Sequence, residues 1–234
     1  MTPLPLWRRG IAEFVGTGLL VAVVVGSGIA AQRLSTDVGL QLLENSLATA
    51  LGLGVLIVLL APVSGAHFNP IVSLADVVLR RRDGLPAREL AVYLPAQIVG
   101  GIGGAVLAGA MFAAPITISR TDRADAATFL AEVVATAGLV LLIMGLVRAG
   151  RSAAVIACAV GAYIGAAYWF TSSTSFANPA VTIARIFTDT FAGIAPASVL
   201  PFLAAQLLGA AVGVLLTVVL FPRTAPADPS TPAP

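Results

Sequence analysis

The sequence predicts an all-α membrane protein with six transmembrane helices and two half-helices, arranged as two inverted repeats. Three observations predict this fold class. The chain of 234 residues is 58% hydrophobic and only 10% charged, whereas a soluble domain carries about 25% charged residues. Apolar runs of the length needed to cross a bilayer, about 20 residues, recur along the chain. Two Asn-Pro dipeptides lie 109 residues apart, and each is followed by a Gln 28 positions later.

Six apolar segments are long enough to be spans. They cover residues 11–31, 42–62, 90–113, 128–148, 152–170 and 199–221. The first follows basic residues, as in a signal peptide, but it is too long for a signal peptide's apolar core, so we interpret it as a retained span. Two shorter apolar segments, 69–79 and 178–187, would reach only about 15 Å as helices, or half the membrane. Two such half-helices entering from opposite sides would together span the membrane once.

An internal repeat organises these segments. AEFVGTGLLV at 12–21 aligns with AEVVATAGLV at 131–140, YLPAQIVGGIGG with FLAAQLLGAAVG, and HFNPIVSLAD with FANPAVTIAR. Each unit reads span, span, half-helix, span, and an odd number of crossings means that the second copy is inverted. We expect a first repeat over 1–114, a second over 115–222, and a disordered Pro-rich tail over 223–234. Inverted repeats place their shared site near the bilayer midplane, at the ends of broken helices.

The placement of arginine predicts the orientation. With the N-terminus in the cytoplasm, nine arginines fall on the inner side and four on the outer side. Cytoplasmic loops carry the excess of basic residues, so we expect both termini in the cytoplasm of a plasma or bacterial inner membrane. Six crossings agree with this, because an even number returns the chain to its starting side. The net charge of +2 and the lack of a basic stripe argue against a nucleic-acid partner.

Each Asn-Pro dipeptide is a favourable helix start. Asn69 and Asn178 are good N-caps, and Pro70 and Pro179 suit the first helical position, where no backbone N–H is needed. Irregular backbone at membrane depth survives only where protein or a watery cavity satisfies it. Two capped starts meeting at the midplane would bring two positive dipole ends and two side-chain amides to one point. Such a point donates hydrogen bonds and repels cations, which predicts a pore for neutral solutes.

On these residues the chain resembles the aquaporin and glycerol-facilitator, or major intrinsic protein, family. SGAHFNP and a second NPA at the expected distance carry the resemblance, which extends over residues 11–221. The resemblance implies one pore per subunit, a homotetramer in the lipid bilayer, and Asn69 and Asn178 as paired pore asparagines. The first motif ends in Ile71 where the second has Ala180, a change expected to alter local packing or width.

No chemistry-bearing cluster indicates an enzyme. The sequence holds no nucleophile–base pair, metal-ligand cluster or Gly-rich phosphate loop, and its one Cys and one His exclude a metal site built from these residues. We therefore expect a non-enzymatic protein without a cofactor or bound metal.

A larger departure from the family pattern lies at Val181. Family members usually place an Arg here, which forms a narrow selectivity filter with an aromatic or His side chain. By spacing, the remaining filter positions are Thr49, Ser175 and Ala166, with Gly165 or Ala167 as alternatives to Ala166. None is charged or aromatic, so we expect a widened filter that passes water, glycerol-sized polyols, urea and neutral metalloid hydroxides such as arsenious acid. The stretch from ANPAVTIAR to FTDTFAG is similar to a bacterial branch that often accompanies arsenic-resistance genes.

Arg185 has two interpretations. It lies four residues after Val181 and therefore shares a helix face with it. It is either a filter arginine displaced by one turn toward the outer mouth, or an interfacial arginine that snorkels or pairs with Asp189.

Two acidic residues open corresponding spans of the two repeats. Ionisable residues within spans are costly and have a function. Glu13 and Glu132 serve either as a proton relay or as acceptors for the irregular backbone before each half-helix, and their symmetric placement favours the second role. We interpret Gln97 and Gln206 as polar partners inside the bundle.

His67 precedes the first Asn by two positions. We expect a loop histidine with satisfied hydrogen bonds, and backbone carbonyls of Gly65, Ala66 and His67 lining the inner vestibule. A pH gate through its ring is the alternative.

The sequence therefore predicts a passive channel, and two other classes stay open. Inverted repeats with broken helices also suit a proton- or ion-coupled secondary transporter, for which Glu13 and Glu132 are the acidic candidates inside spans. A non-conducting structural protein, with Ile71 as a plug, is the second. Flux linear in concentration and independent of a proton gradient would single out the channel.

Overall fold

The computed structural model describes residues 4–80 and 84–222. Over these residues it consists of α1 (Leu6–Leu34), α2 (Val38–Ser64), α3 (Pro70–Leu79), α4 (Leu90–Met111), α5 (Ala126–Arg148), α6 (Ala153–Phe170), α7 (Pro179–Ala184) and α8 (Pro196–Leu220). Single-turn 3-10 helices, Ala87–Glu89 and Arg185–Phe187, precede α4 and follow α7. In this part of the chain six helices, all but α3 and α7, are long and apolar enough to cross a membrane. The predicted fold class and the multi-pass membrane character are confirmed.

The helices extend beyond the spans expected from hydropathy. α1 begins at Leu6 rather than residue 11, and α2 begins at Val38 rather than residue 42. Hydropathy detects the segment that fits the hydrocarbon core, about 20 residues, whereas a helix continues through the interface. The second half-helix is shorter than expected, because α-helical geometry ends at Ala184.

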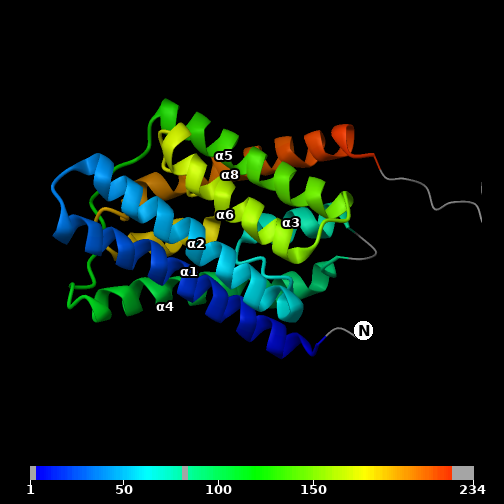
Figure 1. Ribbon diagram of the computed structural model, residues 1–234, viewed down its shortest axis with the longest axis horizontal. Coiled ribbons are helices and arrows are strands. Elements are labelled where there is room, and N and C mark those ends of the chain that lie inside the picture. The colour runs from blue at the N-terminus through cyan, green and yellow to red at the C-terminus, as the bar shows by residue number, and fades with distance from the viewer. Residues whose placement is uncertain (1–3, 81–83, 223–234) are drawn as a thin grey trace, which may run out of the picture.

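The six long helices lie side by side along the longest axis of the molecule (Figure 1). α1 begins and α8 ends at the same end, at the right of Figure 1, where α3 also lies. α7 follows α6 and leads into α8 at the other end, so the two half-helices enter from opposite ends. The tail at 223–234 and three of the thirteen arginines, Arg81, Arg82 and Arg223, lie outside the described residues.

Corresponding helices of the two repeats pack in the same way, α1 against α4 and α5 against α8. Glycine makes both contacts close: a Cβ on Gly213 would lie 2.6 Å from the carbonyl oxygen of Ala137, and one on Gly104 would lie even nearer that of Gly18. Small residues at such crossings let the helix backbones touch. In a membrane this close contact drives helix packing, because burying apolar surface between helices gains little when lipid is equally apolar.

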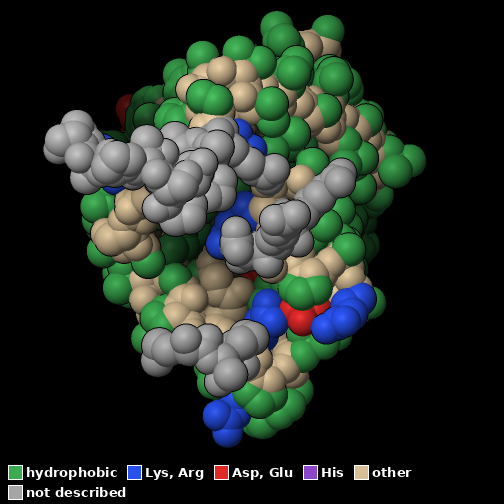
Figure 2. Space-filling view, turned by 90° about the vertical axis from the view of Figure 1, so that its right-hand side faces the viewer, with side chains coloured by type: hydrophobic (Ala, Val, Ile, Leu, Met, Phe, Trp, Pro, Cys, Tyr) green, Lys and Arg blue, Asp and Glu red, His purple; other side chains and the backbone are tan. Residues whose placement is uncertain are grey.

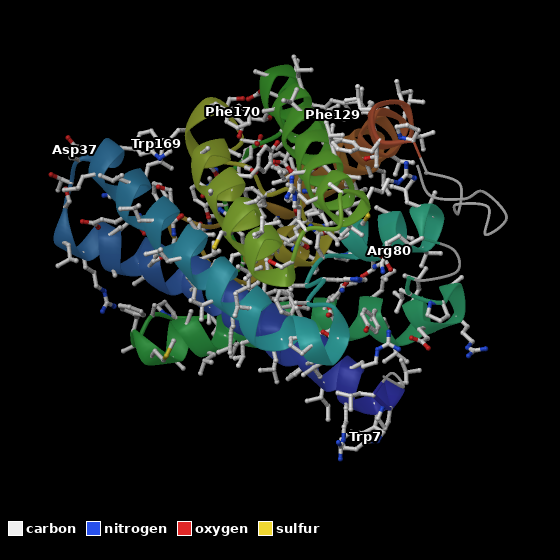
Figure 3. All side chains as sticks on the ribbon, turned by 45° about the vertical axis from the view of Figure 1, so that its right-hand side comes forward. Trp7, Asp37, Arg80, Phe129, Trp169 and Phe170 are labelled. Carbon is white, nitrogen blue, oxygen red and sulfur yellow. The ribbon has the colours of Figure 1, made fainter. Side chains whose placement is uncertain are left out.

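The outer surface fits a lipid environment. Large apolar side chains are exposed along the helices, with Leu51 at 70% and Leu200 at 75% exposure. Trp7 and Trp169 are exposed near opposite ends of the bundle (Figure 3), where aromatic side chains favour the two membrane interfaces. The end face of Figure 2 carries charged side chains between hydrophobic flanks. The distribution is that of a bundle whose ends meet water and whose sides meet lipid.

Candidate pore

A cavity of about 180 Å³ runs between the two halves of the molecule. Side chains of α1, α2, α5 and α6 line it together with both half-helices and the loops that precede them. On α2 the lining extends from Thr49 to Ala61, which corresponds to about 18 Å along the helix axis. The cavity is therefore elongated along the bundle.

Asn69 and Asn178 lie together at the point where the half-helices begin, and both line the cavity. Each side-chain oxygen caps its own helix: Asn69 Oδ1 accepts from the N–H of Ile71, and Asn178 Oδ1 from that of Ala180. Each Nδ2 donates across the repeat boundary, from Asn69 to the carbonyl of Ala177 and from Asn178 to that of Phe68, both at 2.8 Å.

These two crossed hydrogen bonds hold the helix starts tip to tip. An amide nitrogen has two N–H donors, and each Asn uses one of them in the crossed bonds. Among the described residues, the second N–H of each side chain makes no hydrogen bond. Pro70 and Pro179 occupy the first helical positions, as their fixed φ requires.

Glu13 and Glu132 are fully buried behind the half-helix loops, and each carboxylate accepts four hydrogen bonds. Glu13 accepts from the Ser64 hydroxyl, the N–H groups of His67 and Phe68, and Gln97 Nε2. Glu132 accepts from the Ser173 hydroxyl, the N–H groups of Phe176 and Ala177, and Gln206 Nε2. All eight bonds are 2.6–3.0 Å long. This geometry favours the backbone-acceptor interpretation over the proton relay.

The loops held by these carboxylates are strained at equivalent positions. Gly65, Ala66 and Phe68 have φ of 89°, 51° and 50°, and Thr174, Ser175 and Ala177 have 59°, 51° and 45°. Residues other than glycine rarely adopt this left-handed backbone conformation, which costs about 1–3 kcal/mol for each such residue. The four hydrogen bonds to each carboxylate compensate that cost and satisfy N–H groups that no helix can satisfy.

The loop that precedes α3, called the inner loop after the predicted orientation, forms part of the cavity wall. Gly65, Ala66 and His67 line the cavity. His67 Nδ1 lies 3.0 Å from the Ser73 hydroxyl, which also accepts from Gln97 Nε2. His67 and Gln97 therefore share the Ser73 hydroxyl as a hydrogen-bond partner.

Ile71 does not plug the cavity. Its side chain is fully buried in a hydrophobic cluster with Leu79, Val140 and Met144. The plug hypothesis is wrong, because the side chain at this first-turn position points to α5 and away from the cavity lining.

The end of the cavity beside α7, called the outer end after the predicted orientation, differs from the filter expected from the sequence. Thr49, Ser175 and Val181 line the cavity as expected. Ala166 is exposed on the outer surface of α6, and the alternatives Gly165 and Ala167 do not line the cavity either. Ile164 and Tyr168, four residues apart on one face of α6, occupy the wall instead. The Tyr168 hydroxyl lies 3.1 Å from the Thr49 hydroxyl.

Arg185 also lines this end and is only 3% exposed. Its guanidinium carbon lies 3.5 Å from the ring centroid of Phe176, and its Nε donates to the carbonyl of Ala192. The expected pairing with Asp189 is not formed, because Asp189 Oδ1 accepts from the backbone N–H of Arg120. The chain changes to 3-10 geometry at Arg185, which removes the i,i+4 relation on which the pairing depended.

The wall at this end of the cavity therefore includes Tyr168, Phe176 and Arg185 besides the residues predicted by spacing. The sequence could have indicated Tyr168 as a lining residue, since it lies four residues from Ile164 and therefore on the same face of an apolar helix. Phe176 has no such sequence signal, because its side chain is positioned by a left-handed loop.

Comparisons with known proteins agree with this geometry. Residues 1–175 match the model of the family described as "Major intrinsic protein". The chain is 50% identical over 211 residues to aquaglyceroporin AqpS of Rhizobium meliloti (strain 1021), covering 90% of this chain and 88% of that protein. It is 34% identical over 107 residues to the propanediol uptake facilitator PduF of Citrobacter freundii, covering 46% of this chain and 38% of that one.

A solved structure has the same fold. The X-ray structure of the aquaglyceroporin from Plasmodium falciparum superimposes with a TM-score of 0.69 at 20% sequence identity, covering 93% of this chain and 96% of that one. The chain belongs to the major intrinsic protein family, whose members are channels and not enzymes.

Proposed function

We propose that this protein is a passive channel for small neutral solutes: water, glycerol-sized polyols and neutral metalloid hydroxides such as arsenious acid. The observation that carries the proposal is the elongated cavity lined by both Asn69 and Asn178. Their free N–H donors and the two positive helix ends favour an oxygen-bearing solute and disfavour a cation. The similarity to an aquaglyceroporin supports the polyol part of the solute range.

Val181 supports passage of the larger solutes. Its branched apolar side chain lines the cavity in the first turn of α7, where the family usually has an Arg. A shorter, uncharged side chain leaves more room at this level and binds less water. Selection at this level then depends on size and on the hydroxyl groups around it, Thr49 and Ser175.

The proposal includes the organisation of the protein. Two inverted repeats, 1–114 and 115–222, build one pore per subunit, and four subunits assemble in a bacterial inner membrane with both termini in the cytoplasm. The common end of α1 and α8 supports equal placement of the termini (Figure 1), and the excess of arginine at that end supports the cytoplasmic side.

Stopped-flow light scattering of reconstituted vesicles tests the function. We expect vesicles with the protein to take up water, glycerol, urea and arsenious acid faster than empty vesicles. Flux should rise linearly with solute concentration and should not respond to an imposed proton gradient. Saturable uptake driven by the gradient would instead favour a coupled transporter, and vesicles no faster than empty ones for every solute would remove the channel proposal.

A further inference from the structure

Two arginines at the end of the bundle where α1 begins have no acidic partner among the described residues. Arg8, in the first turn of α1, and Arg88, in the 3-10 turn before α4, are both exposed. Within the described chain neither forms a hydrogen bond or an ion pair through its side chain, whereas Arg80 is paired with Asp76. Arg8 and Arg88 therefore carry positive charges that no carboxylate of the described chain neutralises.

One ion pair holds these two arginines near each other. Arg9 Nη1 donates to Glu89 Oε2 at 2.6 Å, and Arg9 Nε donates to the Tyr93 hydroxyl at 3.0 Å. These bonds join the start of α1 to the turn before α4. Arg8 and Arg88 are the chain neighbours of the two members of the ion pair. Three arginines against one glutamate leave an excess of positive charge at this place, so charge complementarity favours an anionic partner.

An exposed apolar face of α1 continues from Arg8 along the helix. It consists of Ile11, Val15 and Leu19, all exposed. With Arg8 they recur every three or four residues, so all four lie on one side of the helix. From Arg8 to Leu19 the helix rises about 16 Å, which is close to the hydrocarbon thickness of one leaflet, about 15 Å. The face therefore has the length and polarity to lie against the acyl chain of a lipid whose headgroup is at Arg8.

Trp7 indicates the depth of this place in the membrane. Its side chain is exposed at the start of α1, on the outside of the bundle (Figure 3), and exposed Trp favours the interface between headgroups and acyl chains. The Arg8 guanidinium carbon lies 5.1 Å from the centroid of the Trp7 ring, a cation–π contact that keeps the charge at this level. A soluble phosphate would use the arginines alone, whereas a phospholipid uses the arginines and the apolar face.

We propose that the start of α1 and the 3-10 turn before α4 form a binding site for one anionic phospholipid. The guanidinium groups of Arg8 and Arg88 contact its phosphate, and the face formed by Ile11, Val15 and Leu19 contacts an acyl chain. None of these residues lines the cavity. The site therefore goes beyond the proposed channel function and does not depend on it.

Fluorescence quenching by brominated lipids tests the site, because the chain has two tryptophans and one of them lies there. In a Trp169→Phe background Trp7 alone reports. The protein is reconstituted into vesicles of phosphatidylglycerol and phosphatidylcholine with equal acyl chains, and one lipid or the other is brominated near its headgroup. The ratio of the two quenching efficiencies measures the preference at Trp7. We expect brominated phosphatidylglycerol to quench Trp7 more strongly than brominated phosphatidylcholine at equal content.

Arg8→Gln and Arg88→Gln should each lower this preference about fivefold, the factor associated with one basic residue beside an anionic lipid surface. Both side chains are exposed and form no hydrogen bond or ion pair within the described chain, so neither change takes such a bond from the fold. The matched control is a double variant, Arg120→Gln with Arg151→Gln. It removes two exposed arginines elsewhere on the protein and should leave the preference unchanged.

The outcomes separate a defined site from a general attraction. Equal quenching of Trp7 by both lipids in the wild type, or a preference that survives both single substitutions, would overturn the site. The same preference at Trp169, measured in a Trp7→Phe background, would mean that anionic lipid gathers around the whole protein and would also overturn it. Relief of the quenching by soluble glycerol phosphate at constant ionic strength would mean a soluble-anion site instead. Solute flux tests the proposed channel separately from all of these results.

Discussion

The two half-helix regions share one scaffold and differ in what they present to the cavity. In both regions a buried Glu accepts hydrogen bonds from a hydroxyl, two backbone N–H groups and a Gln side-chain amide. In both, an Asn caps its own half-helix and donates a hydrogen bond to the loop of the other region. The inner region places His67 and Asp76 beside the cavity, and the outer region places Phe176 and Arg185 at the equivalent positions, 109 residues later. The hydrogen-bonded framework of Glu, Gln and Asn is thus the same in both regions, while the side chains that line the cavity differ.

The two charged lining residues are also neutralised differently. Asp76 accepts from Arg80 Nη1 at 2.8 Å and from the N–H of Leu85 at 2.6 Å, so its charge is balanced within the inner region. Arg185 has only a carbonyl and an aromatic ring as partners among the described residues. The comparison teaches that the charge without an acidic partner among the described residues belongs to the outer region.

The largest effect is expected where the two regions are alike. Glu13→Ala and Glu132→Ala each leave a buried loop with unsatisfied donors, and removal of one member of a buried charged network costs about 3–5 kcal/mol. Both variants should lower the thermal unfolding midpoint of the purified protein by a similar amount. Glu44→Ala, which changes a half-buried Glu of α2, is the control. If one repeat tolerated the change and the other did not, the scaffolds would not be equivalent.

A smaller effect is expected at the helix crossings. Gly104→Val and Gly213→Val each place side-chain atoms against a neighbouring backbone carbonyl, and overpacking of this kind costs about 1–3 kcal/mol. Gly103→Val is a matched control one residue away, since a Cβ there meets nothing within 4 Å. The thermal unfolding midpoint should be lower in the first two variants than in the wild type, and unchanged in Gly103→Val. Equal stability of all three variants would contradict close α1–α4 packing.

Selectivity, rather than stability, should respond to Val181→Arg. A long charged side chain beside Thr49 narrows the outer end, so permeability to glycerol and arsenious acid should fall more than permeability to water. The inner equivalent, Val72→Arg, faces Asp76 four residues on and can pair with it, so its effect on the solute ratio should be smaller. Stopped-flow rates of the two variants decide this. Equal loss of all solutes, or no change, would remove Val181 as the size determinant.

The smallest effect concerns Asp125, which caps α5 in the outer loop. The N–H of Thr128 donates to its carboxylate, and this hydrogen bond lowers the pKa of Asp125 below the ordinary 3.8. A carboxyl with a lowered pKa stabilises the fold above its ordinary pKa, and that contribution is lost as the pH falls through the lowered value. At pH values below about 4, the thermal unfolding midpoint should therefore fall slightly more in the wild type than in Asp125→Asn. The Asn keeps a capping oxygen but does not titrate. Parallel pH profiles would contradict this.

The fold and the centre of the site could be predicted because they follow from local rules. Hydropathy located six helices, the repeat gave their inversion, and the Asn-Pro pairs gave the two capped starts that meet. The outer lining could not be predicted so fully. Ala166 was chosen by counting residues from a motif, but the rotation of α6 about its axis depends on its packing, which turns Ile164 and Tyr168 to the cavity and Ala166 outward. The predicted Arg185–Asp189 pair is not formed for a related reason. The prediction assumed that α-helical geometry continues past Arg185, whereas α7 ends at Ala184.

By itself the sequence determined that this chain spans a membrane six times, that its halves are inverted copies, and that Asn69 and Asn178 mark their junction. These properties depend on composition, periodicity and capping, which are local. Only the tertiary structure decided which side chains line the end of the cavity beside α7. Tyr168 and Phe176 are placed there by helix rotation and by a left-handed loop held on Glu132, and Arg185 by the end of a half-helix, all of which depend on contacts between segments distant in the chain.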